Sequence, residues 1–130
     1  MIAVIFELWP TEGQEAAYFE LAAGLRAELA LMDGFISIER FESLATKGKY
    51  LSLSFWRDEA AVAAWRNREA HRKAQARGRG AGGDGDIADR RGGVLANYRL
   101  RVAQVLRDYG LNDRSQAPQD SREHHEGIAS

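Results

Sequence analysis

The chain has 130 residues, a formal net charge of -1 and 45% hydrophobic residues, as expected for one globular domain. This nearly neutral balance disfavours a general nucleic-acid binder, which carries a basic surplus. The sequence contains no cysteine, so disulfides, zinc–thiolate sites and thiol nucleophiles are excluded. No apolar run approaches the roughly 20 residues of a membrane helix, and the N-terminus lacks the features of a signal peptide. We therefore expect a cytoplasmic protein without nucleic-acid or membrane partners.

The first thirty residues predict a strand followed by a helix. Residues 2–9 (IAVIFELW) are rich in β-branched and aromatic side chains and stop at a proline, which is typical of a strand. Residues 11–32 carry apolar side chains at intervals of three and four, the pattern of an amphipathic helix. Thr11 is placed to cap that helix, and an Asp-Gly pair after it predicts its end.

The next two segments predict a β-hairpin. Residues 35–43 and 49–56 both alternate between two faces, and a short loop containing glycine joins them. In the second segment one face is apolar and the other mixes hydroxyls with aromatic rings: Leu51, Leu53 and Phe55 against Tyr50, Ser52, Ser54 and Trp56. We expect a helix to cover the apolar face, and the mixed face to meet a second sheet or a cleft.

The second half predicts another helix, a loop and a last strand. Asp58 is a favourable N-cap for a helix that begins with EAAVAAW. Residues 77–93 are rich in glycine and arginine and predict a surface loop without a phosphate-binding motif. Residues 94–110 alternate as a long strand, although 103–109 also fit a helix. Residues 111–130 are polar and predict a tail.

The order of these elements is β-α-β-β-α-β, which predicts an α+β, ferredoxin-like fold with a four-stranded antiparallel sheet. Residues 1–110 would form this domain, and residues 111–130 would lie outside it. Both helices would cover one face and leave aromatic and aliphatic side chains on the other. An apolar sheet face of that size is rarely exposed in a soluble monomer, so we expect a homodimer.

The second helix carries the richest chemistry. His71 is the only histidine outside the tail, and a straight helix points it about 120° away from Trp65. A break near Asn67, a poor helix former, would turn both inward. His71 would then serve as an acid–base group, with Arg68 or Arg72 pairing with an anionic substrate. The alternative is a solvated His71, a core Trp65 and surface arginines.

Two further sets of residues have a structural and a functional interpretation. Glu7 lies inside an apolar strand and needs a cationic partner such as Arg99 or Arg101. Several side chains of the third and fourth strands can line a cavity or form a dimer core: Ser52, Ser54, Trp56 and Tyr98. The two adjacent histidines of the tail lack the fixed geometry of a metal site, so we predict no bound metal.

Several sequence segments together carry a family resemblance: DGFISIERF, YLSLSFWRDEAAVAAWRN followed by EAHRKAQ, and YRLRV. Through them the chain resembles the antibiotic biosynthesis monooxygenase domain family over residues 2–110. The resemblance implies a dimeric α/β barrel with a pocket between the sheet and the helices of each protomer. It places Trp65 and His71 near that pocket, and it places Phe6 or Glu7 at the first-strand position.

The resemblance implies three candidate functions. The first is a cofactor-independent monooxygenase that acts on a small aromatic, phenolic substrate and O2. The second is a haem-degrading enzyme, but Gln75 stands where the axial histidine is expected and no asparagine stands at Phe6. The third is a ligand-binding module, expected if the pocket opens without His71. The catalytic candidates are His71 and Trp65, and the substrate-binding candidates are Phe6, Trp56, Asn67, Arg68, Arg72 and Tyr98.

Overall fold

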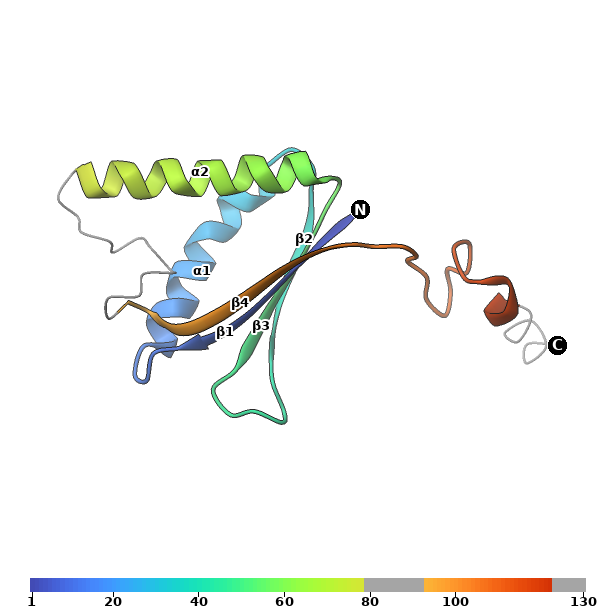
Figure 1. Ribbon diagram of the computed structural model, residues 1–130, viewed down its shortest axis with the longest axis horizontal. Helices are drawn as coiled ribbons and strands as arrows, with labels where there is room; N and C mark the ends of the chain where they lie inside the picture. The colour runs from blue at the N-terminus through green and yellow to red at the C-terminus, as the bar shows by residue number, and fades with distance from the viewer. Residues whose placement is uncertain (79–92, 123–130) are drawn as a thin grey trace.

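The computed structural model describes residues 1–78 and 93–122, with the backbone alone at residues 70 and 72–78. Its elements follow the predicted order (Figure 1). They are β1 (Ile2–Pro10), α1 (Glu15–Ala30), β2 (Phe35–Glu42), β3 (Tyr50–Trp56), α2 (Glu59–Gly78) and β4 (Leu95–Gln104). The predicted α+β class and element order are therefore confirmed.

The four strands form one sheet in the order β2-β3-β1-β4, and every neighbouring pair is antiparallel. The helices α1 and α2 both lie on one side of this sheet (Figure 1). This is the ferredoxin-like arrangement that the sequence predicts. It leaves one sheet face covered by helices and the opposite face open.

The helices cover the face of β3 that carries the serines, contrary to the prediction. Trp56 and Tyr50 pack in the two core clusters with side chains of α1 and α2. Since a strand alternates with period two, Leu51, Leu53 and Phe55 point to the open face. The reason lies in β1, which pairs its large residues with the small ones of β3. Phe6 stands opposite Ser52, and Val4 stands opposite Ser54.

A bulge changes which face the start of β2 presents. The register between β2 and β3 shifts between Phe35 and Ser37. The ring of Phe35 therefore packs edge-on against Trp56 at 5.3 Å between ring centres, on the helix side. Ile36 is left 54% exposed. The sequence analysis placed Phe35 on the same face of the strand as Ser37. A bulge adds one residue to a strand, and it cannot be recognised from the alternation of side chains alone.

The core consists of two clusters at opposite ends of the covered face. One contains Ile2, Leu29, Trp56 and Ala61, and the other contains Leu8, Tyr18, Ala22 and Leu95. Tyr18, Trp56 and Leu8 are the largest fully buried side chains. The middle of β1, at Val4 and Phe6, is only partly buried. The space between the clusters is thus the place where the covered face is least filled.

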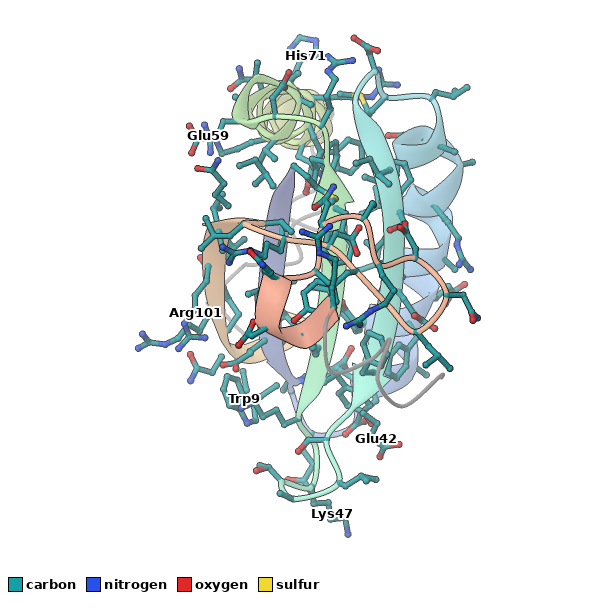
Figure 2. All side chains as sticks on the ribbon, turned by 90° about the vertical axis from the view of Figure 1, so that its right-hand side faces the viewer. Trp9, Glu42, Lys47, Glu59, His71 and Arg101 are labelled. Atoms are coloured by element: carbon teal, nitrogen blue, oxygen red, sulfur yellow. The ribbon has the colours of Figure 1, made fainter. Side chains whose placement is uncertain are left out.

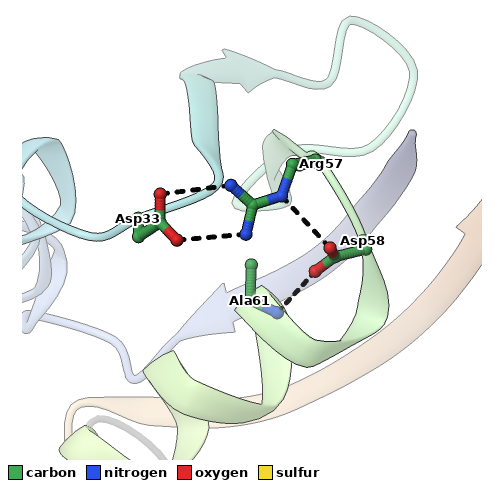
Figure 3. A network of polar contacts seen from close by, with 4 residues as sticks. All are labelled: Asp33, Arg57, Asp58 and Ala61. Carbon is green, nitrogen blue, oxygen red and sulfur yellow. Dashed lines mark hydrogen bonds and ion pairs between the residues drawn. The ribbon is translucent and has the colours of Figure 1, made fainter.

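A charged junction fixes the start of α2 (Figure 3). Arg57 donates two hydrogen bonds of 3.1 Å to the carboxylate of Asp33 and a third, also 3.1 Å, to Asp58. The other oxygen of Asp58 accepts the backbone N–H of Ala61 at 2.9 Å, which confirms Asp58 as the N-cap. Gly34, with φ +86°, accepts the Arg57 backbone N–H at 2.7 Å. The junction ties the end of α1 to the start of α2.

The open face carries a charged group at its centre. Glu7 forms ion pairs with Arg101 at 3.3 Å and with Lys49 at 3.7 Å. The ammonium of Lys49 also lies 5.1 Å from the centre of the Trp9 ring. Arg101, one of the two predicted partners of Glu7, is therefore confirmed.

Four predictions about chain segments have different outcomes. Thr11 does not cap α1; its hydroxyl donates to the Gly93 carbonyl at 2.7 Å, and the helix begins at Glu15 without a side-chain cap. Residues 105–110 are irregular, so the predicted strand 94–110 ends early, at Gln104, and the helical alternative for 103–109 is wrong. The chain beyond β4 runs away from both helices (Figure 1). Most of the predicted loop 77–93 lies outside the described residues.

Candidate active site

A cavity of about 430 Å³ lies between the covered sheet face and the two helices. Its wall is mostly aliphatic and aromatic, with a few polar groups. It is lined by Val4, Phe6, Tyr18, Ala22, Leu25, Leu29, Ile38, Arg40, Ser52, Ser54, Trp56, Val62, Trp65, Arg66, Glu69, Tyr98, Leu100 and Val102. Leu100 and Val102 on the edge strand β4 are 51% and 44% exposed. The cavity is therefore accessible from that edge, and its size and lining are typical of a small-molecule site.

Two cross-strand rows form the floor. One row runs Arg40, Ser52, Phe6 and Leu100, and the next runs Ile38, Ser54, Val4 and Val102. Each row crosses all four strands. The polar groups of these rows therefore lie on β2 and β3, whereas the residues of β1 and β4 in both rows are all apolar.

The two serines explain why the cavity exists. Ser52 and Ser54 are each 6% exposed and stand at the centre of the sheet, where larger side chains would fill the space above them. The Ser54 hydroxyl accepts the indole N–H of Trp56 at 2.9 Å, which satisfies a buried donor. Within the described part of the chain, no hydrogen bond involves the Ser52 hydroxyl. Its oxygen is available to a molecule in the cavity.

The roof is one face of α2. Trp65 and Glu69 are four residues apart and so lie one above the other on the helix, and Arg66 stands beside them. Trp65 and Glu69 are half-buried, whereas Arg66 is exposed. The helix thus brings an aromatic ring, a carboxylate and a guanidinium to one wall of the cavity.

Arg40 is the most unusual group in the wall. It stands on the edge strand β2, half-buried, and its Nε is buried without a hydrogen-bond partner. Among the described residues, no carboxylate lies within ion-pair distance of its guanidinium. Arg40 thus has no partner among the described residues, and an unpaired buried donor such as its Nε is unfavourable.

Four of the predicted site residues line the cavity: Phe6, Trp56, Trp65 and Tyr98. The rings of Phe6 and Tyr98 meet edge-on with 5.5 Å between their centres. Trp56 belongs to the buried core, and its indole N–H already bonds Ser54. Whether these side chains contact a substrate stays a prediction.

Three further predicted site residues, Asn67, Arg68 and His71, do not line this cavity. The helix α2 is continuous from Glu59 to Gly78, so the predicted break near Asn67 is absent. His71 is exposed and points away from the sheet (Figure 2), and Asn67 is exposed as well. Arg68 pairs with Glu28 of α1 at 3.7 Å. The side chain of Arg72 lies outside the described residues.

The sequence analysis did not select three charged lining groups: Arg40, Arg66 and Glu69. A signal for two of them was present. On a continuous helix Glu69 follows Trp65 by four residues and shares its face, and Arg66 is adjacent. The assumption of a broken helix drew attention to His71 instead. For Arg40, the alternation of β2 predicts which residues share its face of the strand. It does not predict that the helices cover this face, so the sequence alone could not identify Arg40 as a lining residue.

The lining does not fit a haem held in the usual way. Histidine, cysteine and methionine are common axial ligands, and none of them is among the described residues that line the cavity. Within those same parts of the chain, no group of three or more His, Asp or Glu side chains is gathered as a metal site. Neither long helix, as far as it is described, is sufficiently apolar to cross a membrane.

Comparisons with known proteins agree with this architecture. A curated jasmonate monooxygenase from Pyricularia oryzae is 43% identical over 113 residues, which are 87% of this chain and 47% of that protein. The chain therefore spans about half the length of this relative. Two solved structures share the fold at low sequence identity. The haem degrader MhuD from Mycobacterium tuberculosis, with two haems bound, has a TM-score of 0.59 and 17% identity, covering 85% of this chain and 100% of that one.

The second structure is SnoaB, a cofactor-independent oxygenase from Streptomyces nogalater. It has a TM-score of 0.59 and 10% identity, covering 82% of this chain and 94% of that one. The sequence model of the antibiotic biosynthesis monooxygenase family matches residues 1–77, which contain β1 to β3 and nearly all of α2. By this match and by the 43% identical relative, the chain belongs to the antibiotic biosynthesis monooxygenase family.

Proposed function

We propose that this chain is a monooxygenase that oxidises a small, largely apolar ring compound in the cavity, with O2 as oxidant. The observation that carries the proposal is the cavity itself, which measures about 430 Å³ in a member of this family and has three charged side chains and two serines in a largely apolar lining. A cavity of this kind holds a ring by apolar contact and orients it by a few polar groups. A phenolic ring or a jasmonate-like molecule, after the curated relative, is the class to test first.

A phenol needs no bound cofactor for this reaction. Loss of a proton makes the conjugated ring carbon electron-rich, and that carbon reacts with O2. When a CH2 group becomes a carbonyl, one O2 is consumed and one water is formed, so all four electrons come from the substrate. Hydroxylation of an isolated CH2 group needs two further electrons from a reductant. The assay therefore includes each compound with and without ascorbate.

The roof of the cavity supplies the groups that such a reaction requires. Trp65 presents an aromatic ring against which a substrate ring can pack. Glu69, one turn further along the same face, is placed to accept the proton. Arg66 is placed to offset the charge of the resulting anion. This assigns to Glu69 the role that the sequence analysis gave to His71.

One observation favours a second function, a ligand-binding module without catalysis. The cavity opens without His71, which is the condition expected for that alternative. The two functions differ in whether the bound ligand is consumed. Ligand binding without O2 uptake, across the whole compound panel, would favour the module.

The proposal is tested by O2 consumption with hydroquinones, phenols that carry a conjugated CH2 group, and jasmonate. Glu69→Gln should reduce the rate about 100-fold or more, because it removes the proposed base. The matched control Glu20→Gln changes an exposed carboxylate of α1 and should keep the full rate. His71→Ala should also keep it. A rate lost in His71→Ala but kept in Glu69→Gln would contradict this assignment.

The cofactor is tested separately. The proposal expects O2 uptake by protein that has been treated with a chelator and carries no flavin or haem absorbance. Adding haemin should not produce a shifted Soret band, because the described cavity wall offers no histidine. A stoichiometric Soret shift that is lost in His71→Ala would instead favour a haem-binding function.

The proposed assembly is a homodimer of cytoplasmic protomers, each with residues 1–110 as the catalytic unit and 111–130 as a tail. The open sheet face supports it, because Ile5, Leu51, Leu53 and Phe55 are only partly buried there in a single protomer. Sedimentation tests the dimer directly, and a stable monomer at micromolar concentration would contradict it.

A further inference from the structure

We infer that Arg40 and Ser52 bind a carboxylate of the substrate, so that the cavity selects small apolar carboxylic acids over their neutral analogues. The inference rests on the proposed function only in taking the cavity as the substrate site. It assigns a substrate class and two binding residues. The argument starts from the state of Arg40 in the free protein.

Arg40 has a charge and a buried donor but no partner. Its Nε is buried and makes no hydrogen bond, and its guanidinium makes no ion pair with any described carboxylate. Glu42 is the nearest carboxylate on the same face of β2, yet it is exposed and lies near the hairpin end of the sheet (Figure 2). An anion that enters the cavity can pair with the charge of this guanidinium.

The other arginines show that this state is not general in the chain. Arg57 engages both oxygens of Asp33 and one of Asp58. Arg114 also has a buried Nε without a partner, but its Nη2 donates to the Ser121 hydroxyl at 2.6 Å. Arg68 pairs with Glu28. Arg40 differs from these three because it faces a cavity.

Ser52 supplies a second donor beside Arg40. The two residues are Cα partners across β2 and β3, so their side chains stand next to each other on the cavity floor. The Ser52 hydroxyl makes no hydrogen bond within the described residues, although the side chain is almost fully buried. A guanidinium fork and an adjacent hydroxyl match the two oxygens of a carboxylate.

The position of this pair also orients the ligand. The row from Arg40 to Leu100 crosses three strand spacings, about 14 Å. A carboxylate held at the β2 end leaves the apolar body over Val4 and Phe6, below Trp65. The carboxylate is then recognised on the floor, separately from Glu69 on the helix roof.

The test compares three carboxylic acids with their methyl esters: 2-naphthoate, cyclopentylacetate and decanoate. Binding is measured by quenching of tryptophan fluorescence without O2, since Trp56 and Trp65 line the cavity. Wild-type protein should bind at least one acid 10-fold or more tightly than its ester. Arg40→Gln should weaken binding of that acid about 10- to 100-fold and leave ester binding unchanged. Arg26→Gln, which changes an exposed arginine of α1, should behave as wild type.

The readout needs no turnover, so a failure to consume O2 does not affect it. Arg40→Lys keeps the positive charge but loses the two parallel donors of the guanidinium. It should therefore retain part of the preference for the acid over its ester. The inference is overturned if no acid binds more tightly than its ester, or if the preference survives in Arg40→Gln. Circular dichroism of each variant checks the fold. If Arg40→Gln does not fold, the wild-type preference for acid over ester and the Arg40→Lys titration decide the question.

Discussion

Two arginines in this fold have opposite surroundings. Arg57, at the start of α2, donates to two carboxylates, and the pKa of its guanidinium is raised, chiefly by the hydrogen bond to Asp33. Arg40, on the wall of the cavity, has a buried Nε without any partner. The first arginine is completed by the protein itself. The guanidinium of Arg40 has no such partner among the described residues, and we propose that a ligand in the cavity supplies one.

This difference separates what holds the fold from what serves a ligand. At the junction of Asp33, Arg57 and Asp58, the charges are paired and the backbone N–H of Ala61 is capped (Figure 3). Around Arg40, the floor of the cavity is formed by small serines, and the Ser52 hydroxyl makes no hydrogen bond within the described residues. Side chains that stay unpaired so that a ligand can bind them lower the stability of the protein. Mutations at the paired junction should therefore destabilise the fold, whereas replacement of the unpaired Arg40 should not.

The largest stability effect is expected at the junction, from Gly34→Ala. A Cβ at Gly34 would lie 2.6 Å from the Cβ of Ala61, and its φ of +86° is strained for any other residue. We expect a loss of about 1–3 kcal/mol in the free energy of unfolding. The matched control is Gly24→Ala in α1, where nothing lies within 4 Å of a new Cβ. That change should stabilise the protein by about 0.5–1 kcal/mol, and urea denaturation measures both.

The second prediction compares the two arginines directly. Arg57→Met removes the ion pairs of the junction and should lower the melting temperature. Arg40→Met replaces an unpaired, half-buried charge by an apolar side chain and should leave stability unchanged or raise it by up to about 1 kcal/mol. A loss of stability in Arg40→Met as large as in Arg57→Met would contradict the interpretation that Arg40 lacks a partner.

The smallest effect is a pH dependence at the junction. Hydrogen bonding to Arg57 holds the pKa of Asp33 below 3.8, and the Ala61 N–H together with Arg57 lowers that of Asp58. Because both folded pKa values are depressed, their contribution to stability is complete above pH 3.8 and is lost as the pH falls through the folded pKa values. Asp33→Asn should therefore be less stable than wild type at pH 7, and the difference should shrink as the pH falls below 3.8. A difference that stays constant over this pH range would contradict the assignment.

The fold followed from the sequence because its signals are local and periodic. Strand alternation, the spacing of apolar residues in the helices and the N-cap at Asp58 each depend on near neighbours. The sequence did not predict which face of the sheet the helices cover. Leu51, Leu53 and Phe55 are the more apolar face of β3, yet the helices cover Ser52 and Ser54 because β1 places large residues opposite them. Cross-strand compensation of this kind depends on which strands pair.

The site was harder to predict because residue type alone favoured a side chain that does not line the cavity. His71 is the usual acid–base candidate, but the continuous helix directs it to solvent. Trp65, predicted as a catalytic residue, lines the cavity, and the place of Glu69 beside it follows from the period of 3.6 residues. Arg40 required the three-dimensional structure, because its buried, unbonded Nε and its place in the cavity wall are not visible in the sequence.

The central claim is that substrate binds between the sheet and α2, with its carboxylate on Arg40 and its apolar body below Trp65. A crystal structure with the most tightly bound acid of the panel tests it most directly. The account predicts a carboxylate oxygen about 2.7–2.9 Å from a guanidinium nitrogen of Arg40, with the ligand body against Trp65. A ligand bound on the open sheet face, or beside His71 on the outer side of α2, would contradict it.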